Sequence, residues 1–427
     1  MNRFYPPATW KDEEDPSRHY YLEGALPLEQ IRVFSWSWLQ KKRQDYTVRT
    51  DLNATLFASW RIILLLPAIP TGFAVKYTNQ SPVATFAVNF VAIIPIGSIL
   101  DVVTEELVIR RGADEGLVLI VTFGNAIQLV ITVIALVKGQ PSIVQTSLVG
   151  AVISNTVLMV GLGFFLGGLK HQVQNFNRMT TGSTFNELVL SIVALLIPTA
   201  MAHFQYIDPP TIAKFSRAES ILLLLSYICY LVYCHKTHKK IIHKLNRIEE
   251  GRTREAQLGH GDAWRGIATI GATMAASAGG TINRTAAMRQ IQHIPLPKIS
   301  SRALVITLIL DTVLLGFCTT FAVDSIDGLT QKTVLTRNFI GLILLPILSC
   351  NLHAIRLAIK NKMTDSFAIN VGSSIQLLLC ILPLAVIIDW IRNDSLMTLV
   401  FDHFQVVSLI VSTMILKYIT DDGKSNW

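Results

Sequence analysis

Long apolar stretches recur along most of the 427-residue chain, separated by short polar or charged segments. A helix needs roughly 20 apolar residues to cross the hydrocarbon core of a bilayer. The stretches are continuous rather than alternating, and a spanning helix satisfies its own backbone hydrogen bonds, so the pattern predicts helices and not a barrel. We expect an all-α, polytopic membrane protein with ten spans, near residues 57–77, 82–100, 115–137, 143–169, 185–204, 218–234, 302–322, 336–358, 366–390 and 395–418.

The composition supports a membrane protein. Hydrophobic residues make up 51% of the chain and charged residues only 15%, with a mean hydropathy of +0.45, whereas soluble domains carry about 25% charged residues. The five cysteines, Cys229, Cys234, Cys318, Cys350 and Cys380, lie in the predicted spans or at their edges. This placement indicates packing between helices rather than a disulfide framework.

The positions of Lys and Arg set the expected orientation. The first 56 residues contain no apolar run, so we expect no cleaved secretory signal and a cytosolic N-terminus. The basic clusters then all fall on the cytosolic side: Lys41–Arg43, Arg110–Arg111, Lys236–Lys240 and Lys360–Lys362. The net charge of +8 therefore reflects topology. Because aromatic residues do not interleave the basic ones, we expect no nucleic-acid partner.

The spans form a group of six and a group of four. We expect a cytosolic segment over 1–56, a leading helix with a first repeat over 57–234, a basic cytosolic linker over 235–300, and a second repeat over 301–427. Three histidines of the linker, His235, His238 and His243, lie among lysines and indicate a basic face more than a metal site.

Each group contains a helix with a polar interruption, followed by a helix rich in Gly, Ser and Gln. In the first group these are "GNAIQLVITVIALVKG" (124–139) and "QTSLVGAVISN" (145–155). In the second they are "LSCNLHAIRLAIKNKM" (348–363) and "INVGSSIQLLL" (369–379). Helix pairs that recur in two halves are typical of secondary transporters, which bind substrate where the repeats meet. Small residues at these spacings also serve close helix packing, so the pattern alone leaves both interpretations open.

These segments resemble the cation/proton exchangers of fungal and plant vacuoles, a branch of the calcium/cation antiporter superfamily. The resemblance is carried by residues 104–177, which begin "TEELVIRRGADEGL", and by "FAVDSIDGL", "NFIGLILLPI", "KNKM", "VGSSIQ", "TLVFDHF" and "DGKSNW". It implies a sodium/calcium-exchanger-like fold of one leading helix plus two five-helix inverted repeats in the vacuolar membrane. It also implies export of cytosolic Ca²⁺ into the lumen in exchange for protons, with these ions as substrates, the lipid bilayer as partner, no cofactor, and possible homo-oligomers.

The family places one helix-embedded acid in each repeat, within "GNAxE" and "GNAAEH" signatures. Gly124 and Asn125 match the first signature, but Gln128 holds its glutamate position. An amide offers one carbonyl oxygen and no titratable proton. In the second repeat no acid lies between Pro346 and Asp365, and the span is about three residues shorter than the family's. The sequence is therefore identified as a divergent member that lacks the usual acidic site residues.

Two more departures concern the second half. Thr320 stands where a third family acid is expected, and the chain ends at "DGKSNW", where the family continues into an eleventh helix. We therefore expect the last helix of the second repeat to be missing.

The resemblance implies a cation path faced mainly by neutral oxygens, whereas Ca²⁺ takes 6–8 oxygen ligands that usually include carboxylates. The candidate residues are Asn125, Gln128, Ser154, Asn155, Ser373, Ser374 and Gln376. Glu105 and Glu106 match the family's "TEE" and are candidates for attracting cations at the cytosolic entrance. Arg110 and Arg111 stand one turn further on, so plain helical ion pairs are the alternative.

Three other ionisable residues lie within predicted spans. Arg356 stands where the second signature is expected, and at a span centre it would repel Ca²⁺. His353 can carry a proton near neutral pH, although a lone histidine is more often a packing residue. Asp311 has no counterpart in the family pattern.

We therefore expect a membrane cation transporter that moves cytosolic Ca²⁺ or another cation into the vacuole against protons, with exchange impaired or selectivity altered. The alternative is a non-transporting exchanger-like membrane protein, either a regulatory partner of a true exchanger or a membrane-embedded enzyme of a specialised biosynthetic pathway. The sequence contains no P-loop, nucleophile elbow or Gly-rich dinucleotide turn, so an enzyme is the less favoured expectation.

Overall fold

Helices formed by the apolar stretches account for nearly all of the regular structure described. The computed structural model describes residues 60–78, 80–111, 121–171, 173–203, 208–232, 299–392, 397–421 and 423–426. All of them belong to one compact unit, Val48–Trp427. The expected cytosolic segment 1–56 and residues 235–298 of the expected linker lie outside the described residues.

The first expected span consists of two short helices, α3 (Trp60–Leu65) and α4 (Ala68–Tyr77). Pro67 lies between them; it has no N–H to donate, and it disfavours helical geometry at the residue before it. The next helix, α5 (Pro82–Arg111), is continuous over 30 residues and runs well past the expected end at residue 100.

The third expected span is interrupted. Residues 121–124 are helical, Asn125 is in a turn, and α7 (Ala126–Val137) follows; residues 112–120 lie outside the described part. The fourth is a single helix built from α8 (Pro141–Ile153), the π-helical segment η2 (Ser154–Met159) and α9 (Val160–Gly168). The helices α10 (Arg178–His203) and α11 (Pro209–Val232) complete the first half.

The second half repeats this order: a long helix, an interrupted helix, a helix with a π-helical segment, and a further helix. Its elements are α15 (Ser301–Lys332), then α16 (Arg337–Phe339), η4 (Ile340–Leu344) and α17 (Leu345–Leu348), a break, α18 (Leu352–Ile359), then α19 (Met363–Gln376), η5 (Leu377–Ile381) and α20 (Leu382–Ile391), and α21 (His403–Thr420).

Seven described helices are long and apolar enough to cross a membrane, and the pair Arg337–Leu348 and Leu352–Ile359, bent by 54°, makes up to eight spans. The difference from the ten expected comes from the divided first span and from α7, which has 12 residues. The last span was expected from residue 395, but α21 begins at His403, after a capping box at Asp402. Before it, the N–H groups of Leu399 and Phe401 donate to Ser216 and Thr199.

Two of the described π-helical segments lie just before a proline. η4 precedes Pro346, and η5 precedes Pro383. A proline cannot donate to the carbonyl four residues earlier, so the helix widens locally there. The segment η2 has no such proline; it begins at Ser154 and Asn155, two of the candidate site residues.

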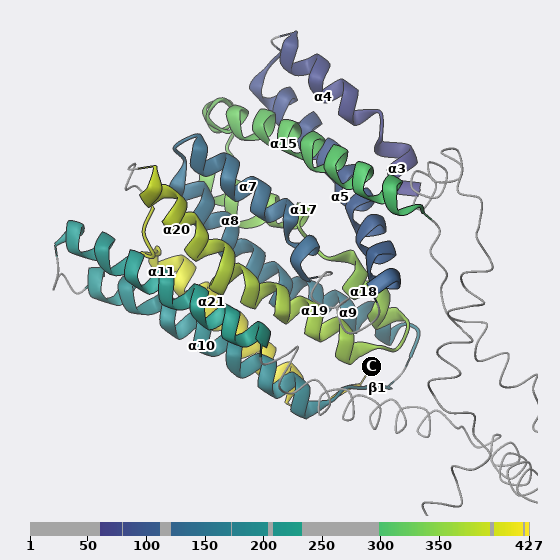
Figure 1. Ribbon diagram of the computed structural model, residues 1–427, viewed down its shortest axis with the longest axis vertical. Helices are drawn as coiled ribbons and strands as arrows, with labels where there is room; N and C mark the ends of the chain where they lie inside the picture. The colour runs from purple at the N-terminus through teal and green to yellow at the C-terminus, as the bar shows by residue number, and fades with distance from the viewer. Residues whose placement is uncertain are drawn as a thin grey trace, which may run out of the picture. The chain divides into compact units, whose positions relative to one another are not determined.

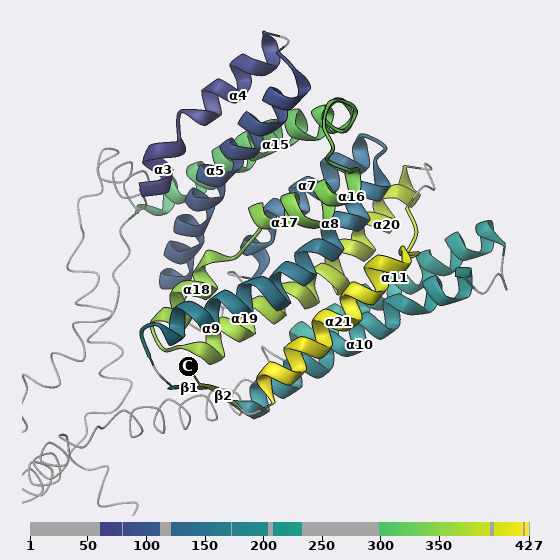
Figure 2. The same cartoon turned by 180° about the vertical axis from the view of Figure 1, so that it is seen from behind.

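Packing inside the unit separates two groups of helices. In both views α3, α4, α5 and α15 lie together at one side, and α10, α11 and α21 at the other (Figures 1 and 2). The helices α5 and α15 are antiparallel, because Pro82 lies against Gly328 and Arg110 contacts Ser301. The interrupted helices and α8, α9 and α19 fill the interior between the two groups.

The two halves also meet at a small sheet. Strand β1 (Val173–Asn175) pairs antiparallel with β2 (Lys424–Asn426), with Gln174 opposite Ser425. Figure 2 shows both strands beside the labelled C-terminus, and Figure 1 labels β1 there.

Candidate functional site

The first helix interruption places an amide against the opposite half of the molecule. Asn125 is the N-cap of α7 and is 3% exposed. Its Nδ2 donates to Gln376 Oε1 at 2.8 Å and to the Ser373 carbonyl oxygen at 3.2 Å. Both acceptors belong to α19. Asn125 therefore meets Ser373 and Gln376, about 250 positions later in the sequence, in the buried interior. All three are candidate site residues.

The second interruption makes the reciprocal contact. Cys350 lies in the break before α18, and its Sγ is 3.2 Å from Ser154 Oγ at the start of η2. Ser154 lies four residues after Gly150, just as Gln376 lies four residues after Gly372. Each interruption thus contacts the same position of the other half's glycine-containing helix. In this correspondence Cys350 matches Asn125, and His353 matches Gln128.

A polar stripe continues along α7 from the interruption. Asn125, Gln128 and Thr132 are spaced by three and four residues, which places them on one helix face, and all three are buried. Gln128 is 0% exposed, and its Nε2 donates to Ser147 Oγ at 3.1 Å. Its Oε1 and Thr132 Oγ1 accept no hydrogen bond from any described residue.

A second polar stripe lies on α19. Ser366, Asn370 and Ser373 are spaced by four and three residues, and each is at most 1% exposed. Ser366 Oγ, Asn370 Oδ1 and Ser373 Oγ have no hydrogen-bond partner within the described part of the chain. Buried polar groups in proteins are almost always hydrogen-bonded or bound to water or an ion. The two stripes, which meet at the Asn125–Ser373 contact, therefore supply a row of unused neutral oxygens.

The remaining candidates contribute less to this row. Ser374 Oγ donates to the Asn370 carbonyl oxygen of its own helix at 3.1 Å, and Asn155 is buried within η2. Thr132, Ser147, Ser366 and Asn370 were not expected as site residues. The signal that would have found them is the helical spacing of each stripe within an otherwise apolar span.

No carboxylate lies among the residues that form the crossing. The sequence has no Asp or Glu within 121–137, 141–168 or 337–359. Residues 363–391 contain Asp365, in the first turn of α19, and Asp389, whose Oδ2 accepts a hydrogen bond from the Met397 N–H at 2.8 Å. The site is therefore uncharged along its length.

The acidic residues lie at one end of the site, next to Arg356. Arg356 is 3.3 Å from Glu105 Oε2 and 3.7 Å from Asp101 Oδ2, and its side chain is 46% exposed. That Arg356 stands at a span centre stays a prediction; the break at residues 349–351 bends the two helices by 54°, and the half-exposed Arg356 side chain lies beside α5. The positive charge of Arg356 faces Asp101 and Glu105 of α5, at the mouth of the site.

A small polar cavity connects this mouth with the interruptions. It has a volume of about 10 Å³, enough for a single water molecule. Its lining residues are Asp101, Thr104, Glu105, Gly124, Asn351 and His353. A Cβ at Gly124 would lie 2.6 Å from Asn351 Nδ2, so a larger residue here would displace the Asn351 side chain.

Glu106, the other entrance candidate, points elsewhere. It is buried, accepts a hydrogen bond from the Ile299 N–H at 3.2 Å, and lies 3.7 Å from Arg110. Its contacts join α5 to the start of α15, so Glu105 and Asp101 are the acids that line the mouth.

The other singled-out residues lie on α15. Thr320 Oγ1 donates to the Gly316 carbonyl oxygen, so it is satisfied within its own helix. Asp311 is 3% exposed and lies on the α5–α15 pair rather than on the helices of the crossing.

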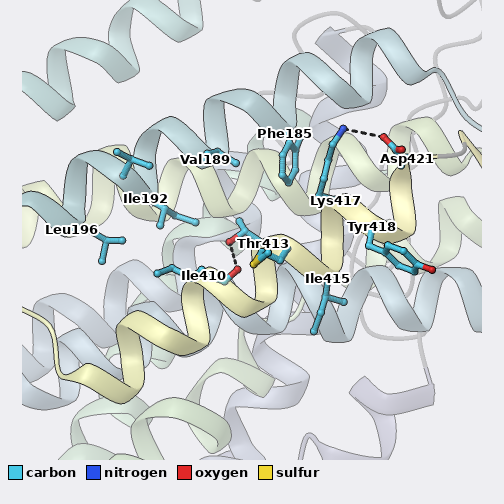
Figure 3. Close-up of a pocket in the computed structure, with 12 residues that line it drawn as sticks. Phe185, Val189, Ile192, Leu196, Ile410, Thr413, Ile415, Lys417, Tyr418 and Asp421 are labelled. Carbon is cyan, nitrogen blue, oxygen red and sulfur yellow. Dashed lines mark hydrogen bonds and ion pairs between the residues drawn. The ribbon is translucent and has the colours of Figure 1, made fainter.

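A larger groove lies between α10 and α21 and is shown in Figure 3. It has a volume of about 900 Å³, and most of its walls are aliphatic, including Val193, Met414 and Ile415, which are also exposed at the surface. An apolar, outward-facing groove on spanning helices suits lipid contact, and it offers few ligands for an ion.

Long apolar helices, two interrupted spans in related halves and a buried polar crossing between them define an integral membrane protein of the secondary-transporter class. Comparison with known proteins identifies the family. The sodium/calcium exchanger protein family matches residues 81–236 and 303–427, and the chain belongs to it.

Relatives cover most of the chain. The vacuolar calcium ion transporter of Schizosaccharomyces pombe is 29% identical over 371 residues, which are 85% of this chain and 79% of that protein. The Ca²⁺/H⁺ antiporter of Aphanothece halophytica is 30% identical, over 85% of this chain and 90% of its own. The crystal structure of the selenium-substituted Ca²⁺/H⁺ antiporter protein YfkE has a TM-score of 0.64 and 25% identity, and it covers 86% of this chain and 93% of that one. The resemblance and the fold expected from the sequence are confirmed.

Proposed function

We propose that this protein is a cation/proton antiporter of the vacuolar membrane, which moves cytosolic Ca²⁺ or another cation into the lumen in exchange for protons. The relatives named as vacuolar calcium ion transporters and Ca²⁺/H⁺ antiporters support the class of activity. We also propose that residues 57–234 and 301–427 form its two exchanger repeats, joined by a basic linker over 235–300. The expected cytosolic N-terminus and homo-oligomer stay predictions.

The observation that carries the proposal is the crossing of Asn125 with Gln376 and Ser373. A buried amide bonded across two halves lies where alternating access would present a site to each side in turn. The unused oxygens of Gln128, Thr132, Asn370 and Ser373 can replace part of the hydration shell of a cation.

The same chemistry weakens binding of Ca²⁺. A buried dication needs compensating negative charge, and each carboxylate replaced by an amide or hydroxyl removes compensation on the order of several kcal/mol. We therefore propose that the site consists of Asn125, Gln128, Ser154, Asn155, Ser373, Ser374 and Gln376, with Glu105 attracting cations at the mouth, and that it binds Ca²⁺ more weakly than a carboxylate site does.

The test is uptake by the full-length protein reconstituted into vesicles with an acidic interior. Radiolabelled Ca²⁺, Na⁺ and Rb⁺ are supplied outside, and we expect accumulation of at least one ion that stops when a protonophore dissipates the gradient. Asn125→Leu should abolish this accumulation, whereas Asn338→Leu, at an exposed position of α16, should not. Wild-type protein that accumulates no ion would contradict the proposal and favour a non-transporting exchanger-like protein.

A further inference from the structure

The polar groups of the crossing are all neutral: they are amide and hydroxyl oxygens together with amide N–H donors such as Asn370 Nδ2, and this bears on the charge of the ion. The oxygens of Gln128, Thr132, Ser366, Asn370 and Ser373 have no partner among the described residues, and all five side chains are at most 2% exposed. Amide and hydroxyl oxygens carry partial negative charge, so they solvate a cation without neutralising it. Neutral carbonyl oxygens serve K⁺ channels in this way.

The penalty for dehydrating an ion rises with the square of its charge, so it is about four times larger for a dication than for a monovalent cation of similar size. A carboxylate site offsets that penalty with its own negative charge. The amides and hydroxyls of the two stripes cannot. The interior therefore discriminates against divalent cations by its charge alone.

The charged groups at the mouth of the site also favour a monovalent cation. Asp101 and Glu105 face it from α5, and Arg356 lies 3.7 and 3.3 Å from their carboxylate oxygens. Among these three groups, the one positive charge balances one of the two negative charges; Asp311 of α15, which is buried and interacts with Asp101, is a further carboxyl outside this count. Arg356 thus supplies a positive charge that a dication at the mouth would otherwise have to supply.

We propose that the transported substrate is a monovalent alkali cation, Na⁺ or K⁺, and that Arg356 sets this preference at the mouth by balancing one of the two carboxylates. The inference rests on the proposed transport function and names its substrate class. It follows from the juxtaposition of the neutral crossing formed by α7 and α19 with the Asp101–Glu105–Arg356 cluster.

The first experiment compares ²²Na⁺, ⁸⁶Rb⁺ as a stand-in for K⁺, and ⁴⁵Ca²⁺ at equal concentrations in vesicles with an acidic interior. We expect gradient-driven uptake of Na⁺ or Rb⁺ to exceed that of Ca²⁺ by about tenfold or more, and the two monovalent arms identify the preferred ion. Uptake of Ca²⁺ at an equal or higher rate would overturn the inference and leave the proposed function standing. Uptake of no ion would overturn both.

The second experiment isolates the mouth. In Arg356→Gln two carboxylates remain without their cationic partner, so Ca²⁺ should inhibit monovalent uptake at about tenfold lower concentration than in the wild type. Lys362→Gln removes the same charge from the exposed N-cap of α19, which forms no ion pair with the described residues of α5, and should leave the inhibition unchanged. Folding of both variants is checked by size-exclusion chromatography. Equal inhibition curves for the two would refute the role of Arg356.

Discussion

The contact between α8 and η4 provides a sensitive test of the packing that positions the site. Gly150 lies against the Leu342 carbonyl oxygen, and an alanine Cβ at this position would be 2.2 Å from that oxygen, about 1 Å inside ordinary van der Waals contact. The obstacle is backbone, and the residue four positions on, Pro346, has no N–H to donate to this carbonyl. Neither side can yield without moving a helix.

We expect Gly150→Ala to lower the free energy of unfolding by about 2 kcal/mol, the usual effect of overpacking. Gly161→Ala, in α9 of the same span, meets no atom within 4 Å and should instead stabilise by about 0.5–1 kcal/mol through helix propensity. The measurement is the thermal midpoint of each purified variant in one detergent, followed by circular dichroism. A midpoint for Gly150→Ala at or above that of Gly161→Ala would refute the close approach.

Gly150→Ala should also disturb the geometry of the site. The helix that contains Gly150 continues into Ser154, and η4 leads through α17 to Cys350, so separating the two helices pulls apart the contact of 3.2 Å between these side chains. Ion uptake by Gly150→Ala should therefore fall below that of Gly161→Ala even where both proteins are fully folded. Uptake is measured at a temperature well below the thermal midpoints of both variants.

Three further outcomes follow from the site. Gln128→Glu alone should not restore calcium tolerance to a cell that lacks its vacuolar exchanger, because the second half still has no acid between Pro346 and Asp365; restored growth on high calcium would contradict this. Gln376→Leu leaves Asn125 with one of its two acceptors and should lower the free energy of unfolding by about 1–2 kcal/mol, whereas Gln80→Leu, at an exposed position, should have little effect on the thermal midpoint. Reversing Arg356 to Glu should cost about 1 kcal/mol or less, as expected for half-exposed pairs, and the double change with Glu105→Arg should recover part of it; a double variant no more stable than either single one would argue against the pair.

The sequence was sufficient for the helices whose apolar stretches are long and uninterrupted. It also pointed to the two halves, because polar interruptions within apolar spans are rare and recur here around Asn125 and Cys350. The interruption of the first span could have been expected from Pro67, whose effect on the helix is local. Such local effects can be predicted from a single sequence.

Features that depend on tertiary contact could not be predicted in this way. Nothing in the local sequence indicates that Arg356 pairs with Asp101 and Glu105, because the bend of α18 decides where its side chain lies. The partner of Asn125 is 251 residues away, and only the fold brings the two amides together. Glu105 and Glu106 are neighbours in sequence but lie on different faces of α5, which separates their environments.

The ladder between β1 and β2 constrains which parts of the molecule can move during transport. It ties residues 173–175 of the first half to residues 424–426 of the second, so α9 and α21 cannot swing apart without breaking backbone hydrogen bonds. The pair α5 and α15 has no such tether in the described residues, and it meets the interior partly through the exposed ions of Arg356 and Glu105. We therefore expect α5 and α15 to move relative to the helices that this ladder joins.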